Sequence, residues 1–126
     1  MTALPERYDL TVNAGATLKR WFRLTYPDNS IVNFTTAGYT IGRLTIRDVY
    51  GGTVQFALTT ANGGIDLTYQ ADANGVFWSG NIYASAAATA ALVDWGDGVF
   101  DLEIDNGSDV IRVMQGVAVL SPEASV

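Results

Sequence analysis

The sequence predicts an all-β domain, an antiparallel β-sandwich of about eight short strands with one short helix. Three observations predict it. Apolar and polar residues alternate in most segments, turn residues interrupt this alternation at a spacing of roughly 8–12 residues, and one alanine-rich stretch departs from it. A partly closed barrel is the alternative architecture, because periodicity alone does not distinguish a barrel from a sandwich.

The first half of the chain contains five predicted strands, over residues 8–12, 18–26, 31–34, 39–47 and 53–58. In the second strand, Leu18 and Phe22 share one face, whereas Lys19, Trp21 and Arg23 share the other. We expect the apolar face of each strand to point into the sandwich. In the fifth strand this inner face consists of Val54, Phe56 and Leu58.

The second half contains further strands, predicted over residues 65–69, 76–83, 99–105 and 110–120. Asn74-Gly75 and Asn106-Gly107 separate neighbouring strands as hairpin turns, for which an Asn-Gly pair is a strong signal. The inner face of the last strand changes near Gln115-Gly116, which indicates a β-bulge. The alanine-rich stretch over residues 85–93 predicts the short helix, with Ser85 as its N-cap.

The length of 126 residues fits a single domain, which we expect over residues 8–121. Residues 1–7 form an N-terminal arm in this division, and residues 122–126 form a C-terminal tail. Residues 1–7 lack the charged and then apolar order of a signal peptide, and no stretch approaches about 20 apolar residues. We therefore expect neither a secretory signal nor a membrane span.

The composition argues against most enzyme classes. The chain has no Cys and no His, which removes thiolate nucleophiles, zinc and iron–sulfur sites, and histidine-based acid–base catalysis. With 7 basic and 13 acidic residues, it also lacks the basic stripe that binds nucleic-acid phosphates. We expect no enzymatic activity, no cofactor and no metal.

Acidic residues gather between positions 94 and 109, where the alternatives are a calcium site, a pair of catalytic carboxylates, or a solvated outer face. Calcium requires six to eight oxygen ligands, and the spacing here differs from that of an EF-hand loop. Asp101 and Glu103 share one strand face and do not oppose each other across a cleft, as glycosidase acids do. We favour a solvated face paired with Arg43 and Arg47.

The aromatic residues offer a second kind of candidate site. Trp21 shares its strand face with cations, and an outward tryptophan indicates an interface. Trp78 and Trp95 lie near strand and turn ends, where we favour capping of the core over binding of sugars or a protein partner. The first strand, which begins at Tyr8, has an edge that a neighbouring molecule could order. The candidate protein-interface residues are Trp21, Arg23, Arg43, Arg47 and Tyr8.

Several segments resemble those of a known group of proteins. They are the opening Tyr8-Asp-Leu-Thr-Val-Asn-Ala-Gly-Ala-Thr17, the Asn33-Phe-Thr-Thr-Ala-Gly-Tyr-Thr40 corner, the strand Ile41-Gly-Arg-Leu-Thr-Ile-Arg47, the helix Ala86-Ala-Ala-Thr-Ala-Ala-Leu92, the strand Gly98-Val-Phe-Asp-Leu-Glu-Ile104, Met114-Gln-Gly116 and Ser121-Pro-Glu123. In this order, the segments resemble small virion proteins of tailed bacteriophages and the N-terminal, immunoglobulin-like domain of phage baseplate upper proteins. The resemblance covers nearly the whole chain.

The resemblance implies an immunoglobulin-like sandwich and a non-enzymatic role in the virion, in the neck, tail, baseplate or fibre region. Its partners would be other virion proteins, bound in multiple copies, and not nucleic acid or a membrane. Baseplate upper proteins continue into further domains, so this chain corresponds to their attachment module. The alternatives are a capsid decoration protein and a carbohydrate- or receptor-binding module that uses exposed aromatics. An acid-pair glycoside hydrolase is the third hypothesis.

Overall fold

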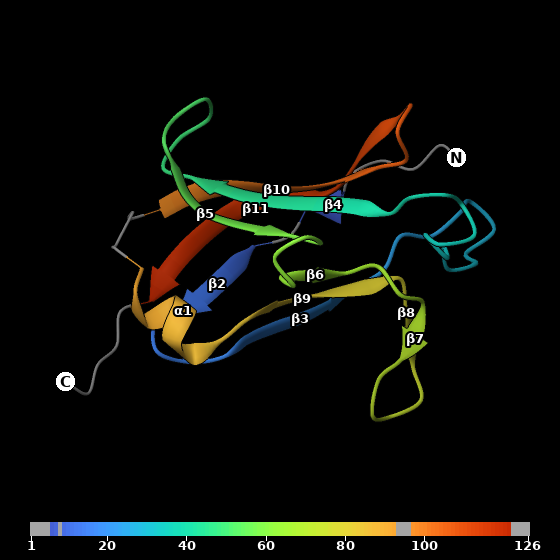
Figure 1. Cartoon of the computed structure of the whole chain (residues 1–126), viewed down its shortest axis with the longest axis horizontal. Helices are drawn as coiled ribbons and strands as arrows, with labels where there is room; N and C mark the ends of the chain where they lie inside the picture. Colours follow the sequence, from blue (N-terminus) through green and yellow to red (C-terminus); the bar gives the residue numbers. More distant parts are fainter. Residues whose placement is uncertain (1–5, 8, 93–96, 122–126) are drawn as a thin grey trace.

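The computed structural model describes residues 6–7, 9–92 and 97–121, which fold into two packed β-sheets (Figure 1). The larger sheet has six strands: β1 (Glu6–Arg7), β2 (Leu10–Asn13), β4 (Ile41–Arg47), β5 (Val54–Thr59), β10 (Asp97–Asp105) and β11 (Val110–Ser121). The smaller sheet has three strands: β3 (Leu18–Phe22), β6 (Ile65–Asp66) and β9 (Gly80–Ala84). A hairpin of β7 (Gln70–Ala71) and β8 (Phe77–Trp78) projects beside the smaller sheet.

The strand order is that of an immunoglobulin-like sandwich. The neighbours β11, β10, β4 and β5 occupy the places of strands G, F, C and C′, and the order β3-β9-β6 occupies the places of B, E and D. The first strands, β1 and β2, pair in parallel with the last strand, β11. The predicted all-β sandwich is therefore confirmed. The structure also places Glu6–Arg7 in the sheet, before the predicted domain boundary at residue 8.

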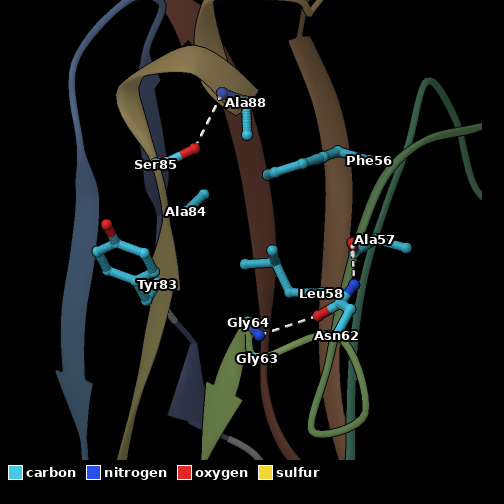
Figure 2. A pocket seen from close by; sticks show the side chains of 10 residues that line it. All are labelled: Phe56, Ala57, Leu58, Asn62, Gly63, Gly64, Tyr83, Ala84, Ser85 and Ala88. Atoms are coloured by element: carbon cyan, nitrogen blue, oxygen red, sulfur yellow. Dashed lines mark hydrogen bonds between the residues drawn. The ribbon is translucent and has the colours of Figure 1, made fainter.

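The predicted helix is present as α1 (Ala86–Ala90), which follows β9 directly. The Ser85 hydroxyl accepts a hydrogen bond from the Ala88 backbone N–H at 3.1 Å (Figure 2), so Ser85 is the N-cap, as the sequence predicts. The helix covers one end of the sandwich, next to the end of β9.

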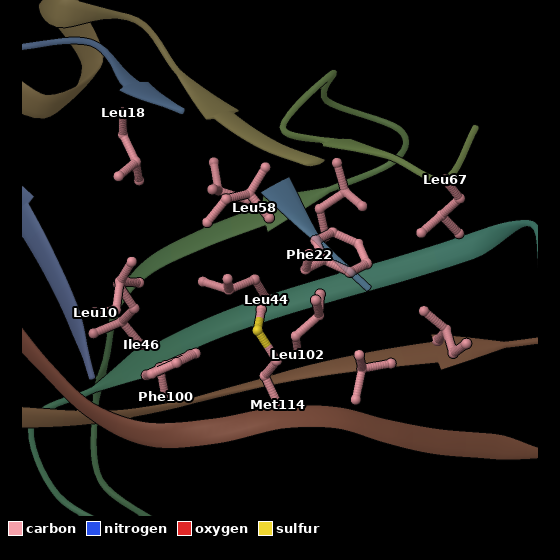
Figure 3. Close-up of a cluster of buried hydrophobic side chains, with 14 of the residues drawn as sticks. Leu10, Leu18, Phe22, Leu44, Ile46, Leu58, Leu67, Phe100, Leu102 and Met114 are labelled. Carbon is pink, nitrogen blue, oxygen red and sulfur yellow. The ribbon is translucent and has the colours of Figure 1, made fainter. Parts of the chain in front are cut away.

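The core lies between the sheets and follows the predicted alternation (Figure 3). The central strands β4 and β10 pair so that Leu44 faces Leu102 on the inner side. Ile46 and Ile104 also point inward, and all four side chains are fully buried. Burying a side chain of this size contributes about 1.5–3 kcal/mol, so this central pair supplies much of the apolar stabilisation.

The last strand contains the predicted bulge at a different position. The register between β10 and β11 shifts at Leu102/Glu103, so that Met114 pairs with Leu102 and Arg112 pairs with Glu103. Val113 is the extra residue, and both Val113 and Met114 are buried. The predicted position at Gln115-Gly116 is therefore wrong by two residues, because the change of face occurs at the two adjacent buried residues Val113 and Met114 and not at the glycine.

Two of the predicted strands differ from expectation, one in the orientation of its first inner-face residue and one in its pairing. Val54 is 46% exposed, although the sequence placed it on the inner face of β5. A register shift between Ile46 and Arg47 turns the start of β5 outward. The segment 31–34 forms only an isolated bridge, between Thr25 and Ile31, even though Val32 within it is fully buried.

A buried threonine joins α1 to the turn that follows β2. The Thr89 hydroxyl accepts a hydrogen bond from the Gly15 N–H at 3.1 Å and donates to the Ala16 carbonyl at 2.8 Å. Thr89 is fully buried. These bonds satisfy two backbone groups of a turn that lies 74 residues away in the sequence.

We expect Thr89→Val to lower the free energy of unfolding by about 1–3 kcal/mol, because the Gly15 N–H and the Ala16 carbonyl lose their partner. Urea unfolding followed by circular dichroism measures this change. Thr40→Val is the matched control at an exposed threonine and should change the free energy by less than about 0.5 kcal/mol. Equal effects of the two substitutions would contradict an anchoring role for Thr89.

Candidate functional site

The outer face of the smaller sheet carries the most concentrated set of aromatic and cationic side chains. Leu18 and Phe22 of β3 are buried, so Lys19 and Trp21 point to the opposite, outer side, and Arg23 continues this side beyond the strand end. The sequence predicted this orientation for all three. Burial of the apolar side chains of β3 therefore determines which of its side chains lie on the outer face of the sheet.

Trp78 of the β7–β8 hairpin completes a row of two rings and two cations. The Trp21 and Trp78 ring centroids lie 6.5 Å apart, with an interplanar angle of 31°. Lys19 Nζ lies 5.0 Å from the centroid of the Trp21 ring, and Arg23 Cζ lies 4.1 Å from that of Trp78. We call these four residues the aromatic–cation face.

Asp72 fixes the Trp78 ring. One of its carboxylate oxygens accepts from Trp78 Nε1 at 2.9 Å, and the other accepts from the backbone N–H groups of Asn74 and Val76 at 2.8 and 3.1 Å. The same carboxylate thus shapes the hairpin turn, where Gly75 adopts a φ of +79°. The predicted Asn-Gly hairpin is confirmed, and it serves to position an aromatic ring.

The position of Trp78 differs from the core-capping role that the sequence favoured. The predicted strand 76–83 is interrupted at Ser79, which is fully buried and accepts from the Leu24 N–H at 3.1 Å. This break lets Trp78 lie half-buried on the outer side, against Trp21 and Arg23. Its indole N–H donates a hydrogen bond to Asp72 on this outer side, and not to an acceptor in the core.

Two carboxylates border the face and are held in their charged form. The hydrogen bond from Trp78, followed by those from Val76 and Asn74, lowers the pKa of Asp72. Partial burial acts to raise the pKa of Asp66, but hydrogen bonds from Thr68 and Gln70 and the charge of Lys19 outweigh it, so that the pKa of Asp66 is also lowered.

The remaining predicted interface residues lie elsewhere. Arg43 and Arg47 belong to β4, on the outer face of the larger sheet, so the sandwich separates them from Trp21 and Arg23. Arg43 forms an ion pair with Asp105 at 3.5 Å, and Arg47 donates to the Gly52 carbonyl at 2.8 Å. Tyr8 lies outside the described residues, as do Trp95 and Asp94.

The acidic strand face is paired with arginine partly as expected: Arg43 pairs with Asp105, whereas Arg47 bonds to a backbone carbonyl instead. Arg112 of β11 lies 3.8 Å from both Asp101 and Glu103. The sequence paired these acids with β4 alone and missed Arg112, because the bulge in β11 decides which side chain opposes Glu103. Within residues 6–7, 9–92 and 97–121, no three metal-binding side chains gather closely enough to hold a metal ion.

The hairpin also carries an exposed aromatic pair that was not predicted from the sequence. The rings of Tyr69 and Phe77 stack with their centroids 5.0 Å apart at an angle of 16°, and the two residues are 37% and 45% exposed. They are diagonal neighbours across the hairpin, because Ala71 pairs with Phe77. Their positions on either side of the Asn-Gly turn are the sequence signal that identifies them.

A groove of about 450 Å³ lies between β5 and the end of β9 (Figure 2). Phe56 and Leu58 form one wall, and Tyr83, Ala84 and Ala88 form the other. The described residues that line it carry no carboxylate, amine or guanidinium group. This apolar lining offers packing contacts and no acid–base pair.

No protein-family model and no curated protein matches this chain. No helix among the described residues is long and apolar enough to cross a membrane. The site is therefore interpreted from its own geometry.

We expect Trp78→Phe to raise the pKa of Asp72 toward its ordinary value of 3.8, because the substitution removes the main donor to the carboxylate. The folded-state pKa of Asp72 is depressed, so its contribution to stability is complete above the unfolded-state pKa and disappears as the pH falls through the folded-state pKa. Carboxyl ¹³C NMR titration measures the change.

Trp21→Phe is the control for this titration, since Trp21 lies in the same row without bonding to Asp72. The Trp21→Phe variant should leave the pKa of Asp72 unchanged. If both variants moved the pKa equally, the row of rings and not the indole N–H would determine it.

Proposed function

We propose that this protein is a non-enzymatic structural protein of a bacteriophage virion. It acts as an adaptor or attachment module of the neck, tail, baseplate or fibre region and docks onto other virion proteins. The observation that carries the docking role is the aromatic–cation face, a row of Lys19, Trp21, Trp78 and Arg23 formed by β3, the residue after it and the β7–β8 hairpin.

The chemistry of this face supports protein docking. Trp and Arg are enriched among the residues that dominate binding energy in protein interfaces, where large rings exclude water from polar contacts. Asp72 and the stacking contacts hold both rings in place before binding, so little side-chain entropy remains to be lost. The smaller sheet supports the face from below through buried residues such as Phe22 and Ile82.

The virion context rests on the segments that resemble phage virion proteins, among them 8–17, 33–47 and 98–104. The immunoglobulin-like strand order agrees with the fold that this resemblance implies. In a particle, neighbouring copies that contact one another would dock together onto repeated sites, so weak individual contacts would add through avidity. A capsid decoration protein is a variant of the same role, with a different partner.

The acidic strand supports a structural role. Asp101, Glu103 and Asp105 are ion-paired with Arg112 and Arg43 along an open sheet face. They lie side by side on this face, whereas a glycosidase needs two acids that oppose each other across a substrate cleft.

Mass spectrometry and reconstruction of intact virions test the proposal, and we expect the protein at stoichiometric copy number. Particles that lack it should bind the purified protein, and Trp21→Ala should weaken that binding about 30-fold, as expected for an interface hot spot. Tyr50→Ala is the control, since Tyr50 is an aromatic residue 79% exposed, on the turn between β4 and β5. Absence from the particle would overturn the proposal.

Carbohydrate or receptor binding is the second candidate, and the exposed Tyr69–Phe77 stack favours it, since stacked aromatic faces suit sugar rings. A glycan array with the intact protein should then give a signal that Phe77→Ala removes. Val76→Ala, an exposed neighbour on the same hairpin, should leave the signal unchanged. Absence of binding to every glycan would reject this candidate.

A further inference from the structure

The cations of this protein differ in what they contact. Four described arginines already have oxygen partners: Arg20 donates to the Lys19 carbonyl, Arg43 and Arg112 pair with carboxylates, and Arg47 donates to the Gly52 carbonyl. Lys19 and Arg23 are different. Among the described residues, no carboxylate lies within ion-pairing distance of either, and each rests on an aromatic ring.

Arg23 is held in a geometry that suits a carboxylate. Its guanidinium stacks 4.1 Å from the Trp78 centroid, and its Nε is buried with no hydrogen-bond partner in the described part of the chain. The donors of a guanidinium lie in its plane, so stacking on a ring occupies its face, and burial of Nε closes the edge on that side. The remaining edge, formed by the two Nη groups, can donate two parallel hydrogen bonds to a carboxylate.

The acids that border this face do not supply that carboxylate. The oxygens of Asp72 accept from Trp78, Asn74 and Val76, which form the hairpin turn. Asp66 accepts from the Thr68 N–H at 2.9 Å and from Gln70 Nε2 at 3.1 Å. The charges of Lys19 and Arg23 help to lower the pKa of Asp66 and Asp72, respectively, but neither cation forms an ion pair with these acids. Both acids stabilise their own loops, so an external carboxylate can still form an ion pair with each cation.

We propose that the aromatic–cation face binds an acidic segment of a partner protein in extended conformation, with one carboxylate on the Arg23 edge and a second on Lys19. This inference rests on the proposed docking function and specifies the chemistry of the partner. Lys19 and Arg23 are four residues apart along an extended chain, so their Cα atoms are separated by about 13 Å. Acidic side chains at positions i and i+4 of an extended partner match this span.

The two-point geometry favours a peptide over an acidic sugar. A single uronate ring carries one carboxylate and would engage one cation, whereas an extended chain places two carboxylates at the required separation. Apolar or β-branched residues between the two acids would pack on Trp21 and Trp78, which lie between the cations.

NMR titration of the full-length protein tests this inference, with acetylated, amidated Glu-Thr-Val-Thr-Glu as the probe. We expect the indole N–H signals of Trp21 and Trp78 to shift, and the affinity to fall as salt is raised. The neutral analogue Gln-Thr-Val-Thr-Gln should bind at least about tenfold more weakly, because it lacks the charge-assisted hydrogen bonds.

Variants of the protein complete the test. Arg23→Gln should lower the affinity for the acidic peptide about tenfold, and Arg23→Lys should recover only part of it, because lysine lacks the planar fork. Lys19→Gln should also weaken binding. Arg112→Gln, on the outer face of the larger sheet, is the matched control and should leave the affinity unchanged.

Several results would overturn the inference. They are equal binding of the neutral peptide, an Arg23→Gln variant that binds normally, or sodium glucuronate giving the same shifts at the same carboxylate concentration. The last result would assign the face to acidic sugars. Failure here is distinguishable from failure of the proposed function. If the protein is present in virions but does not bind the acidic peptide, only the proposed partner chemistry is refuted. If the protein binds the acidic peptide but is absent from virions, only the virion role is refuted.

Discussion

The alternation of side chains along β3 is the constraint on which both the core and the interaction face depend. Successive residues of a strand must point to opposite sides, so burying Leu18 and Phe22 forces Lys19 and Trp21 outward. A slip of one residue in the register of β3 would place Trp21 in the core and Leu18 in solvent. The apolar core therefore orients the surface that we assign to docking.

Much of the fold was predictable from local patterns. The inner faces of β4 and β10, the N-cap Ser85 and the Asn74-Gly75 hairpin each depend on neighbouring residues, and the structure confirms them. Register was less predictable, because the adjacent apolar residues Val113 and Met114 interrupt the alternation without indicating which of them lacks a partner on the neighbouring strand.

The candidate site was predictable in part. The sequence identified Trp21 and Arg23 from the charge on one strand face, but it grouped them with Arg43 and Arg47. Only the sheet topology separates these pairs, because β3 and β4 belong to different sheets. The contribution of Trp78 depends on the break at Ser79, whose buried bond to Leu24 is a long-range contact that no local pattern encodes.

The parallel pairing of the first and last strands has a mechanical consequence. Leu10 of β2 lies beside Ala118 of β11, and Asn13 lies beside Ser121, so the two strands run in the same direction. A force that pulls the start of β2 away from the end of β11 acts along both strands. Their ladder of hydrogen bonds then bears the load in shear, all bonds together, and resists rupture more strongly than a ladder that opens one bond at a time.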